Sequence, residues 1–304
     1  MDAARILGKA RAMTYQFYIG NRLYFSWSLA AYMMFEKFGL RDHVKTTEFR
    51  PEAENGVRPL MTDLAPARTL PTVVAPDGAV LNDSIAIAEE LASRHPDIPF
   101  WPADPLARGT ARALAAEMHS SFGTLRSSWH MNLRQAYAPQ AEPAEVTAEL
   151  DRLEELWSHA RAVTNPQGPW LCGDFSLVDA IFAPMAARLA IYGFDSRPVT
   201  KSYVAAHLGD PAFRRWRAMG LANVGIIQEC ERDYETAHWP GPTPLKARAV
   251  ADGTGSVNET CPYSGDPVTD FLEFDGRIFG FCNAFCRDKT VEDPEAWPAF
   301  MALT

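Results

Sequence analysis

The sequence predicts an α/β domain, then an all-helical domain, then a small ββα module. Strand-like and helical patterns alternate over residues 14–96, and only helical periodicity is found over residues 104–235. Prolines and glycines then crowd residues 236–258, and the last segment, 259–304, holds three of the five cysteines. We therefore expect two domains at 14–96 and 104–235, a linker at 236–258 and a separate Cys-rich module at 259–304.

The first domain shows β-branched and aromatic runs broken by turn residues and helical stretches. TYQFYI (14–19) and VKTTEF (44–49) predict strands, and Asp77-Gly78 predicts a hairpin turn. The expected elements are a strand at 14–19, a helix at 28–38, a strand at 44–49, a short helix at 60–64, a hairpin at 69–82 and a helix at 85–94.

The second domain shows apolar residues at helical spacing. The pattern predicts a single long helix over 110–133, a second over 144–163, and a short one over 211–219. Ser176, with Asp179 three residues on, resembles a capping box at a further helix start.

Composition and charge exclude several classes of function. Lys and Arg total 29 against 38 for Asp and Glu, so the formal net charge of −9 argues against nucleic-acid binding. No apolar run approaches the ~18 residues of a membrane span, and the first residues lack the apolar core of a secretory signal. We expect a cytoplasmic protein without membrane partners, whose natural start is Met1 or Met13.

Four segments together resemble the glutathione S-transferase family. They are YIGNRLYFSWSL, APARTLPTVV, the Asp83-Ser84 pair and GDFSLVDAIFAPM. The resemblance covers residues 14–235 and is closest to Ser-type bacterial members. It implies a thioredoxin-like N-terminal domain, a helical C-terminal domain, a homodimer, and glutathione as co-substrate.

Ser26 and Ser28 are the candidates for activating the thiol of glutathione. A thiol becomes nucleophilic when its pKa falls, and a helix N-terminus with a donating hydroxyl lowers it. Both serines lie near the start of the predicted first helix, and Tyr24 is another nearby hydroxyl. The family pattern favours Ser26, while plain helix capping is the alternative for either serine. A Cys-type mechanism is excluded, because no cysteine precedes Cys172.

The resemblance also implies how the tripeptide is held. Leu70 would pair with the glutathione backbone ahead of a cis Pro71, and Asp83 with Ser84 would hold the γ-glutamyl end. The family usually has Glu where Asp83 stands, so the shorter side chain has less reach. The alternatives are an ordinary edge-strand proline at Pro71 and a helix cap at Asp83-Ser84.

The second substrate would be a small electrophile bound beside the predicted helix 110–133. His119, Arg126 and His130 form part of a polar stripe on this helix and are the candidate electrophile-site residues. A solvated helix face is the alternative interpretation of that stripe, and the sequence does not name the electrophile.

The C-terminal segment has the spacing Cys261-x20-Cys282-x3-Cys286. With CPYSG in front and FDGRIFGFC as strand-turn-strand, it resembles the TRASH/YHS type of treble-clef-like knuckle. A module this small needs a stabilising metal, and thiolates suit zinc or copper(I). Asp266, His238 or water would be the fourth ligand. The alternative is a disulfide plus a free thiol.

The leading hypothesis is a glutathione-dependent transferase with an appended metal-binding module. Two alternatives stay open. The first is a zeta-like glutathione-dependent isomerase, although Phe25 and Trp27 depart from the SSCS motif of that class. The second is a non-catalytic protein that uses the fold to sense or carry metal or thiols.

Overall fold

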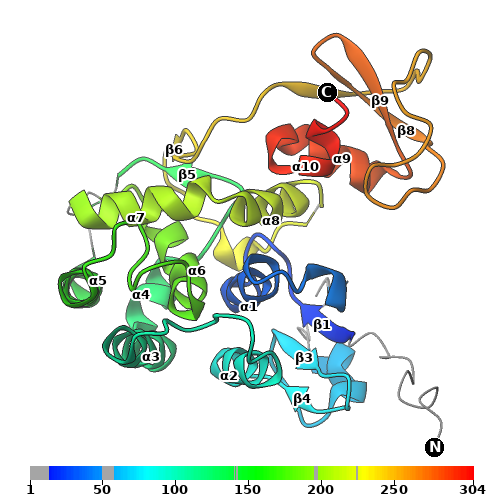
Figure 1. Ribbon diagram of the computed structural model, residues 1–304. Coiled ribbons are helices and arrows are strands. Elements are labelled where there is room, and N and C mark those ends of the chain that lie inside the picture. The colour runs from blue at the N-terminus through cyan, green and yellow to red at the C-terminus, as the bar shows by residue number, and fades with distance from the viewer. Residues whose placement is uncertain (1–13, 50–57, 140, 142, 195–197, 224) are drawn as a thin grey trace, which may run out of the picture.

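The computed structural model describes residues 14–49, 58–139, 141, 143–194, 198–223 and 225–304. It contains a thioredoxin-like domain, a helical domain and a small sheet-and-helix module, as Figure 1 shows from blue through green to red. The predicted fold class is confirmed, and the first two parts together form the glutathione S-transferase fold.

The thioredoxin-like domain is built on a four-stranded sheet of order β2-β1-β3-β4. Strand β1 runs parallel to β2 and antiparallel to β3, because the connection from β1 to β2 passes through helix α1. The strands are β1 (Tyr15–Ile19), β2 (Val44–Glu48), β3 (Thr72–Val74) and β4 (Val80–Leu81); the helices are α1 (Ser26–Lys37) and α2 (Ser84–Arg94), with 3₁₀ turns η2 (Arg41–His43) and η3 (Arg58–Leu64).

The helical domain packs around α6, which is buried on nearly all sides. The predicted capping box is confirmed, because the Asp179 side chain accepts the Ser176 backbone N–H at 2.9 Å. The helices are α3 (Pro105–Ser120), α4 (Gly123–Ser128), α5 (Ala144–Thr164), α6 (Leu177–Ile191), α7 (Pro198–Gly209) and α8 (Pro211–Leu221). A two-stranded ribbon of β5 (Ala136–Tyr137) and β6 (Thr236–Ala237) and the 3₁₀ turn η4 (Gln228–Cys230) complete this part.

The prediction of one helix over 110–133 is wrong. The chain leaves the helix at Ser121, which is extended, and turns at Phe122, which has a left-handed φ of 61°. Phe122 is 2% exposed, so burial of its ring in the core holds a conformation that local preference disfavours. Helix α7 was not predicted.

The C-terminal module is residues 247–304. Its sheet has the order β7-β8-β9, with β7 (Ala247–Val250), β8 (Asp270–Phe274) and β9 (Arg277–Phe281). Helix α9 (Ala284–Glu292), the 3₁₀ turn η5 (Pro294–Ala296) and helix α10 (Pro298–Met301) follow. Asp275 and Gly276 both have positive φ, as a tight hairpin requires. Strand β7 lies inside the expected linker 236–258, so the structured module begins earlier in the chain than we expected.

The C-terminal module packs against the rest of the chain and is not joined to it by the linker alone. Helix α8 lies between α1 and α9, as Figure 1 shows. Arg214 of α8 makes a bidentate pair with Asp293, with N···O distances of 2.8 and 2.6 Å. Arg215 bonds Glu36 of α1 and the carbonyl of Ala296. These contacts join the three parts at one helix.

In the described residues, every helix is either too short or too polar to cross a lipid bilayer.

Candidate functional site

The start of α1 separates the roles of the two candidate serines. Ser28 is fully buried, and its Oγ accepts the backbone N–H of Gly20 at 3.3 Å. Ser26 is the first residue of α1 and is half-buried, and its hydroxyl has no hydrogen-bond partner within the described residues. Ser28 therefore ties the β1–α1 loop to the helix, whereas Ser26 presents a free hydroxyl at the positive end of the helix dipole.

Tyr24 carries the third hydroxyl of this loop, and that hydroxyl is already hydrogen-bonded to another part of the protein. Its OH donates to Glu231 Oε1 at 2.5 Å, and its side chain is 6% exposed. Burial and the bond to Glu231 raise the pKa of Tyr24 well above its usual value. A buried phenol that is held protonated against a carboxylate stabilises the domain interface and is not free to serve a ligand.

Leu70 and Pro71 lead into β3 beside the start of α1. The peptide bond between them is cis, as the resemblance implied. The side chain of Leu70 packs in a small cluster against Phe25, which directly precedes Ser26. The backbone N–H and C=O of Leu70 make no hydrogen bond within the described residues.

Asp83 and Ser84 stand at the N-terminus of α2 and share a partner that was not predicted for them. Asp83 Oδ1 caps the helix, and Asp83 Oδ2 lies 2.9 Å from His119 Nε2. Ser84 Oγ lies 3.2 Å from His119 Nδ1. His119 of α3 therefore bridges the pair that was expected to hold the γ-glutamyl end. The capping interpretation of Asp83 is confirmed, and its role in binding glutathione stays a prediction.

Trp27 connects this pair to one further predicted residue. The Trp27 and His119 ring centroids are 5.4 Å apart, and the Arg126 guanidinium lies 5.5 Å from the Trp27 ring centre. His119 and Arg126, two of the three expected electrophile-site residues, thus meet at Trp27 on α1. The sequence analysis considered Trp27 only as a departure from the SSCS motif. Its position between Ser26 and Ser28 at a helix start was the feature that could have marked it as a site residue.

The third expected electrophile-site residue, His130, is not brought to this cluster. Its Nδ1 lies 3.1 Å from the carbonyl of Glu229 and 3.1 Å from Arg232 Nη2. Burial and the Arg232 charge lower the pKa of His130. The left-handed turn at Phe122 and the end of α4 before Trp129 direct His130 toward the loop that follows α8, and so break the stripe that the sequence predicted.

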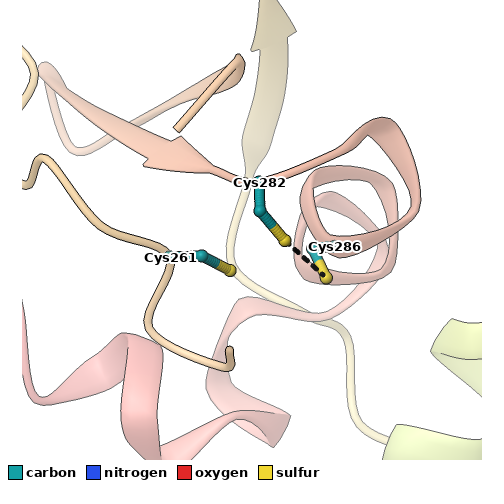
Figure 2. A group of neighbouring side chains, drawn as sticks. All are labelled: Cys261, Cys282 and Cys286. Atoms are coloured by element: carbon teal, nitrogen blue, oxygen red, sulfur yellow. Dashed lines mark hydrogen bonds between the residues drawn. The ribbon is translucent and has the colours of Figure 1, made fainter. Parts of the chain in front are cut away.

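The three C-terminal cysteines converge. Cys261 comes from a loop, Cys282 follows β9 and Cys286 lies on the first turn of α9, and Figure 2 shows their sulfurs pointing toward one another. All three Sγ atoms lie within 4.8 Å of each other, and those of Cys282 and Cys286 are 3.9 Å apart. All five cysteines of the chain are free thiols, so the disulfide alternative has no support in the structure.

Hydrogen-bond donors surround these sulfurs. Ser264 Oγ and Asn283 Nδ2 each donate to Cys282 Sγ at 3.3 Å. Burial works to raise the pKa of Cys261, but backbone N–H groups, that of Cys282 foremost, outweigh it and lower the pKa to about 7. Burial raises the pKa of Cys286 to about 12. Donors to sulfur favour the thiolate form that a metal requires.

The expected fourth ligands are not at the cluster. No described His, Asp or Glu side chain joins the three thiols, and both Asp266 and His238 are exposed elsewhere. Asp266 takes part only through its backbone carbonyl, which accepts the Cys261 N–H at 2.8 Å. The protein thus supplies three thiols, and Ser264 is a nearby side-chain oxygen.

Comparisons with known proteins agree with this architecture. Residues 25–94 match the family described as glutathione S-transferase, N-terminal domain. A glutathione transferase homologue from Burkholderia, solved with bound glutathione, is 23% identical; the alignment covers 68% of this chain and 98% of that one with a TM-score of 0.50. That likeness shows the fold.

Two curated relatives match shorter stretches. A probable maleylacetoacetate isomerase of Caenorhabditis elegans is 39% identical over 67 residues, which is 22% of this chain and 31% of that protein. A stringent starvation protein A homolog of Pasteurella multocida is 29% identical over 148 residues, which is 49% of this chain and 65% of that protein. The chain therefore spans about one third to two thirds of the length of these relatives.

Proposed function

We propose that this chain binds glutathione and joins it through its thiol to a small electrophile. The observation that carries the proposal is the free hydroxyl of Ser26 at the N-terminus of α1, next to a thioredoxin-like sheet. Ser28 and Tyr24 are already engaged by Gly20 and Glu231. Among the three hydroxyls, Ser26 is the one that a ligand thiol can use.

In this proposal the tripeptide lies between the ends of β3 and α2. The backbone of Leu70, ahead of Pro71, pairs with the glutathione backbone, and Asp83 with Ser84 binds the γ-glutamyl ammonium and carboxylate. Glutathione bound to the Burkholderia homologue supports a tripeptide ligand for this fold. Because His119 now contacts both Asp83 and Ser84, it must move aside or share them when the ligand binds.

The mechanism follows from charge. The α1 N-terminus and the Ser26 hydroxyl stabilise the glutathione thiolate, which forms a C–S bond with the electrophile. In a substitution the leaving group departs with the electron pair, and in an addition the anion formed on the electrophile takes up a proton. Trp27, His119 and Arg126 form the electrophile wall, and the Arg126 cation favours a substrate with a negative or polarised group. His130 has no part in this site.

The test compares two serines two residues apart. Ser26→Ala should lower conjugation of chlorodinitrobenzene by about one to two orders of magnitude, the loss expected for removing one donor to a developing anion. Glutathione affinity should change little. Ser28→Ala is the matched control, since its hydroxyl serves Gly20. Equal activity of wild type and Ser26→Ala, or a failure of the wild type to bind glutathione, would refute the proposal.

A second candidate is glutathione-dependent cis–trans isomerisation, which the match to the probable maleylacetoacetate isomerase favours. Here the thiolate adds to a double bond, rotation occurs and the thiolate leaves again, so no glutathione is consumed. Arg126 would pair with a substrate carboxylate. Isomerisation of maleylacetoacetate without loss of free thiol would favour this activity over conjugation.

A third candidate is a non-catalytic sensor or carrier. The contact of His119 with Asp83 and Ser84 favours it, because a residue of the chain itself fills the pair that would hold the ligand. Tight glutathione binding by His119→Ala but not by the wild type, with no turnover by either protein, would support this candidate.

We also propose that Cys261, Cys282 and Cys286 hold one metal ion, zinc or copper(I). The observation is the fit: a tetrahedral site with Zn–S bonds near 2.3 Å needs sulfurs roughly 3.8 Å apart, and these sulfurs already lie within 4.8 Å of one another. Zinc would take water or the Ser264 oxygen as a fourth ligand, whereas copper(I) accepts three thiolates alone. Bound metal would supply structural stability to the module.

Anaerobic purification followed by elemental analysis tests the site. We expect one metal per chain in the wild type, and a loss of metal in Cys282→Ser but not in Cys172→Ser, whose thiol is buried in the helical domain. Absence of stoichiometric metal in the wild type would exclude the proposal. We further propose that the protein is cytoplasmic and forms a homodimer. Sedimentation equilibrium tests the homodimer.

A further inference from the structure

A cavity of about 420 Å³ lies where the C-terminal module meets the thioredoxin-like domain. Its walls come from five places: strands β1 and β2, the β1–α1 loop, the second half of α1 with η2, helix α8, and the module itself. The module contributes Tyr263, Lys289 and Trp297. Ser26, Leu70, Asp83 and Ser84 are not among the lining residues, so this cavity is separate from the proposed glutathione site.

Lys289 is the unusual side chain of this cavity. It is 7% exposed, and its ammonium makes no hydrogen bond and no ion pair within the described residues. Its neighbours are aromatic faces: Nζ lies 4.0 Å from the ring centre of Tyr263 and 4.2 Å from that of Trp297. Burying an ammonium is costly unless an anion accompanies it, and two rings offset only part of that cost.

The other charges of the cavity are already matched or lie at its mouth. Arg22 is paired with Glu48, and Glu36 is held by Arg215 at 2.7 Å. Arg41 has a side chain that is 53% exposed and lies 3.6 Å from Glu36. Asp42 also lines the cavity and is exposed on η2. Among the described lining residues, Lys289 is therefore the mostly buried cation without an ion-pair partner, and the opposite charges that act on it are those of Cys286 and Cys261 in the neighbouring cysteine cluster.

Aromatic side chains line the cavity on the module and on the helices opposite it. Tyr263 and Trp297 belong to the module, while Tyr32 of α1 and Trp216 of α8 stand on the other side, with ring centroids 4.8 Å apart. A volume of this size suits a small organic molecule, since such sites usually measure ~300–1,000 Å³. Two cations of the lining, Lys289 and Arg41, lie near the aromatic side chains of Tyr32 and Tyr263, and this combination favours a ligand with a planar body and one acidic group.

We propose that this cavity binds a small organic anion. Its carboxylate or phosphate pairs with Lys289 and Arg41, and its apolar body lies against the partly exposed side chains of Tyr32, Met219 and Tyr263. The module's Lys289 lies one turn beyond Cys286 on α9, and Tyr263 lies two residues beyond Cys261. The ligand would thus contact the side of the module next to its cysteines.

The experiment uses the full-length, metal-loaded chain and three probes of one shape: 1-naphthoate, 1-naphthyl phosphate and the neutral 1-naphthamide. Calorimetry at low ionic strength should show saturable binding of at least one acid and binding of the amide that is weaker by tenfold or more, since a charge-assisted contact is worth about that factor. The ratio of the dissociation constants of the two acids tells whether the site prefers a carboxylate or a phosphate.

Three variants locate the binding. Lys289→Met keeps a side chain of similar length and removes the charge. Arg41→Gln changes an exposed residue at the mouth of the cavity. Each substitution should weaken the binding of the two acids about tenfold. Arg248→Gln is the control, because Arg248 is an exposed arginine of the module paired with Glu273. If Lys289→Met does not fold, Arg41→Gln decides alone. Acid binding should be the same with and without saturating glutathione, and in Ser26→Ala.

Several results would contradict the proposed anion site. Equal binding of acids and amide, no saturable binding of either acid, or displacement of the acids by glutathione would overturn the proposal. So would a Lys289→Met protein that loses metal but binds the acids as the wild type does, because Lys289 would then serve only as counter-charge to the cysteine thiolates.

Discussion

The docking of the C-terminal module can be tested through one ion pair. Arg214 and Asp293 make two parallel N–H···O bonds, and their side chains are 17% and 8% exposed. We expect the substitutions Arg214→Met and Asp293→Asn each to remove this link between the module and α8. If the three parts unfold as one unit, these changes must lower the stability of the whole chain.

The expected magnitude follows from the burial of the pair. An exposed pair contributes about 0–1 kcal/mol, whereas removing one partner of a buried pair costs about 3–5 kcal/mol. This pair is mostly buried, but Glu295 lies 3.4 Å from Arg214 and would compensate in part after Asp293→Asn. We therefore expect about 2 kcal/mol for each single change and a coupling free energy of about 1–2 kcal/mol in the double-mutant cycle.

Urea unfolding followed by far-UV circular dichroism and by tryptophan fluorescence supplies the measurement. The two signals should give one coincident transition for the wild type and for each variant. Asp252→Asn is the matched control, because that exposed carboxylate accepts hydrogen bonds from the neighbouring Thr254 and from no other residue that the structure describes. A coupling free energy below about 0.3 kcal/mol, or a separate transition of the module in the wild type, would refute the docked arrangement.

Three further changes test other parts of the structure. Ser28→Ala should cost about 1–2 kcal/mol, because it leaves the buried N–H of Gly20 without its acceptor, and chemical denaturation measures the loss. Burial, with a smaller effect of Lys37, lowers the pKa of His207 to about 3, so stability is retained above pH 6.5 and falls as the unfolded chain takes up a proton below it. His207→Leu should therefore lose about 2 kcal/mol less than the wild type between pH 6.5 and 4.5, at ~1.4 kcal/mol per unit; equal pH profiles would contradict this. Gly280→Ala should destabilise the module by about 1–3 kcal/mol, since the new Cβ would stand 2.6 Å from Cβ of Val268, and an unchanged melting temperature would count against this packing.

Local signals in the sequence predicted those parts of the fold that local interactions specify. The capping box at Ser176 and Asp179 and the Asp275-Gly276 turn use residues within three positions of each other, so their patterns are visible without the fold. The break at Phe122 is different. Its left-handed backbone is held by burial of the ring among distant side chains, and the helical periodicity continues through it. Periodicity alone therefore predicted one helix too long.

The same distinction applies to strand β7 and to the candidate site. Strand β7 lies among prolines and glycines and exists because residues 247–250 pair with β8, more than twenty positions away. Ser26 and Ser28 look alike in the sequence, since both lie at a helix start. The 0% exposure of Ser28 and its bond to Gly20 assign it a structural part, and that information is available only from the packed loop.

The position of α8 bears on how the C-terminal module must be studied. Ala218 of α8 is 1% exposed because the module covers it, and Met219 packs against the same apolar cluster. Deleting the module would uncover this face and leave Arg214 and Arg215 without their partners Asp293 and Ala296. Such a truncation would destabilise the helical domain whether or not the cysteines bind metal. Single substitutions such as Cys282→Ser keep the docked surface, and so they separate the chemistry of the cysteines from the packing that holds the module in place.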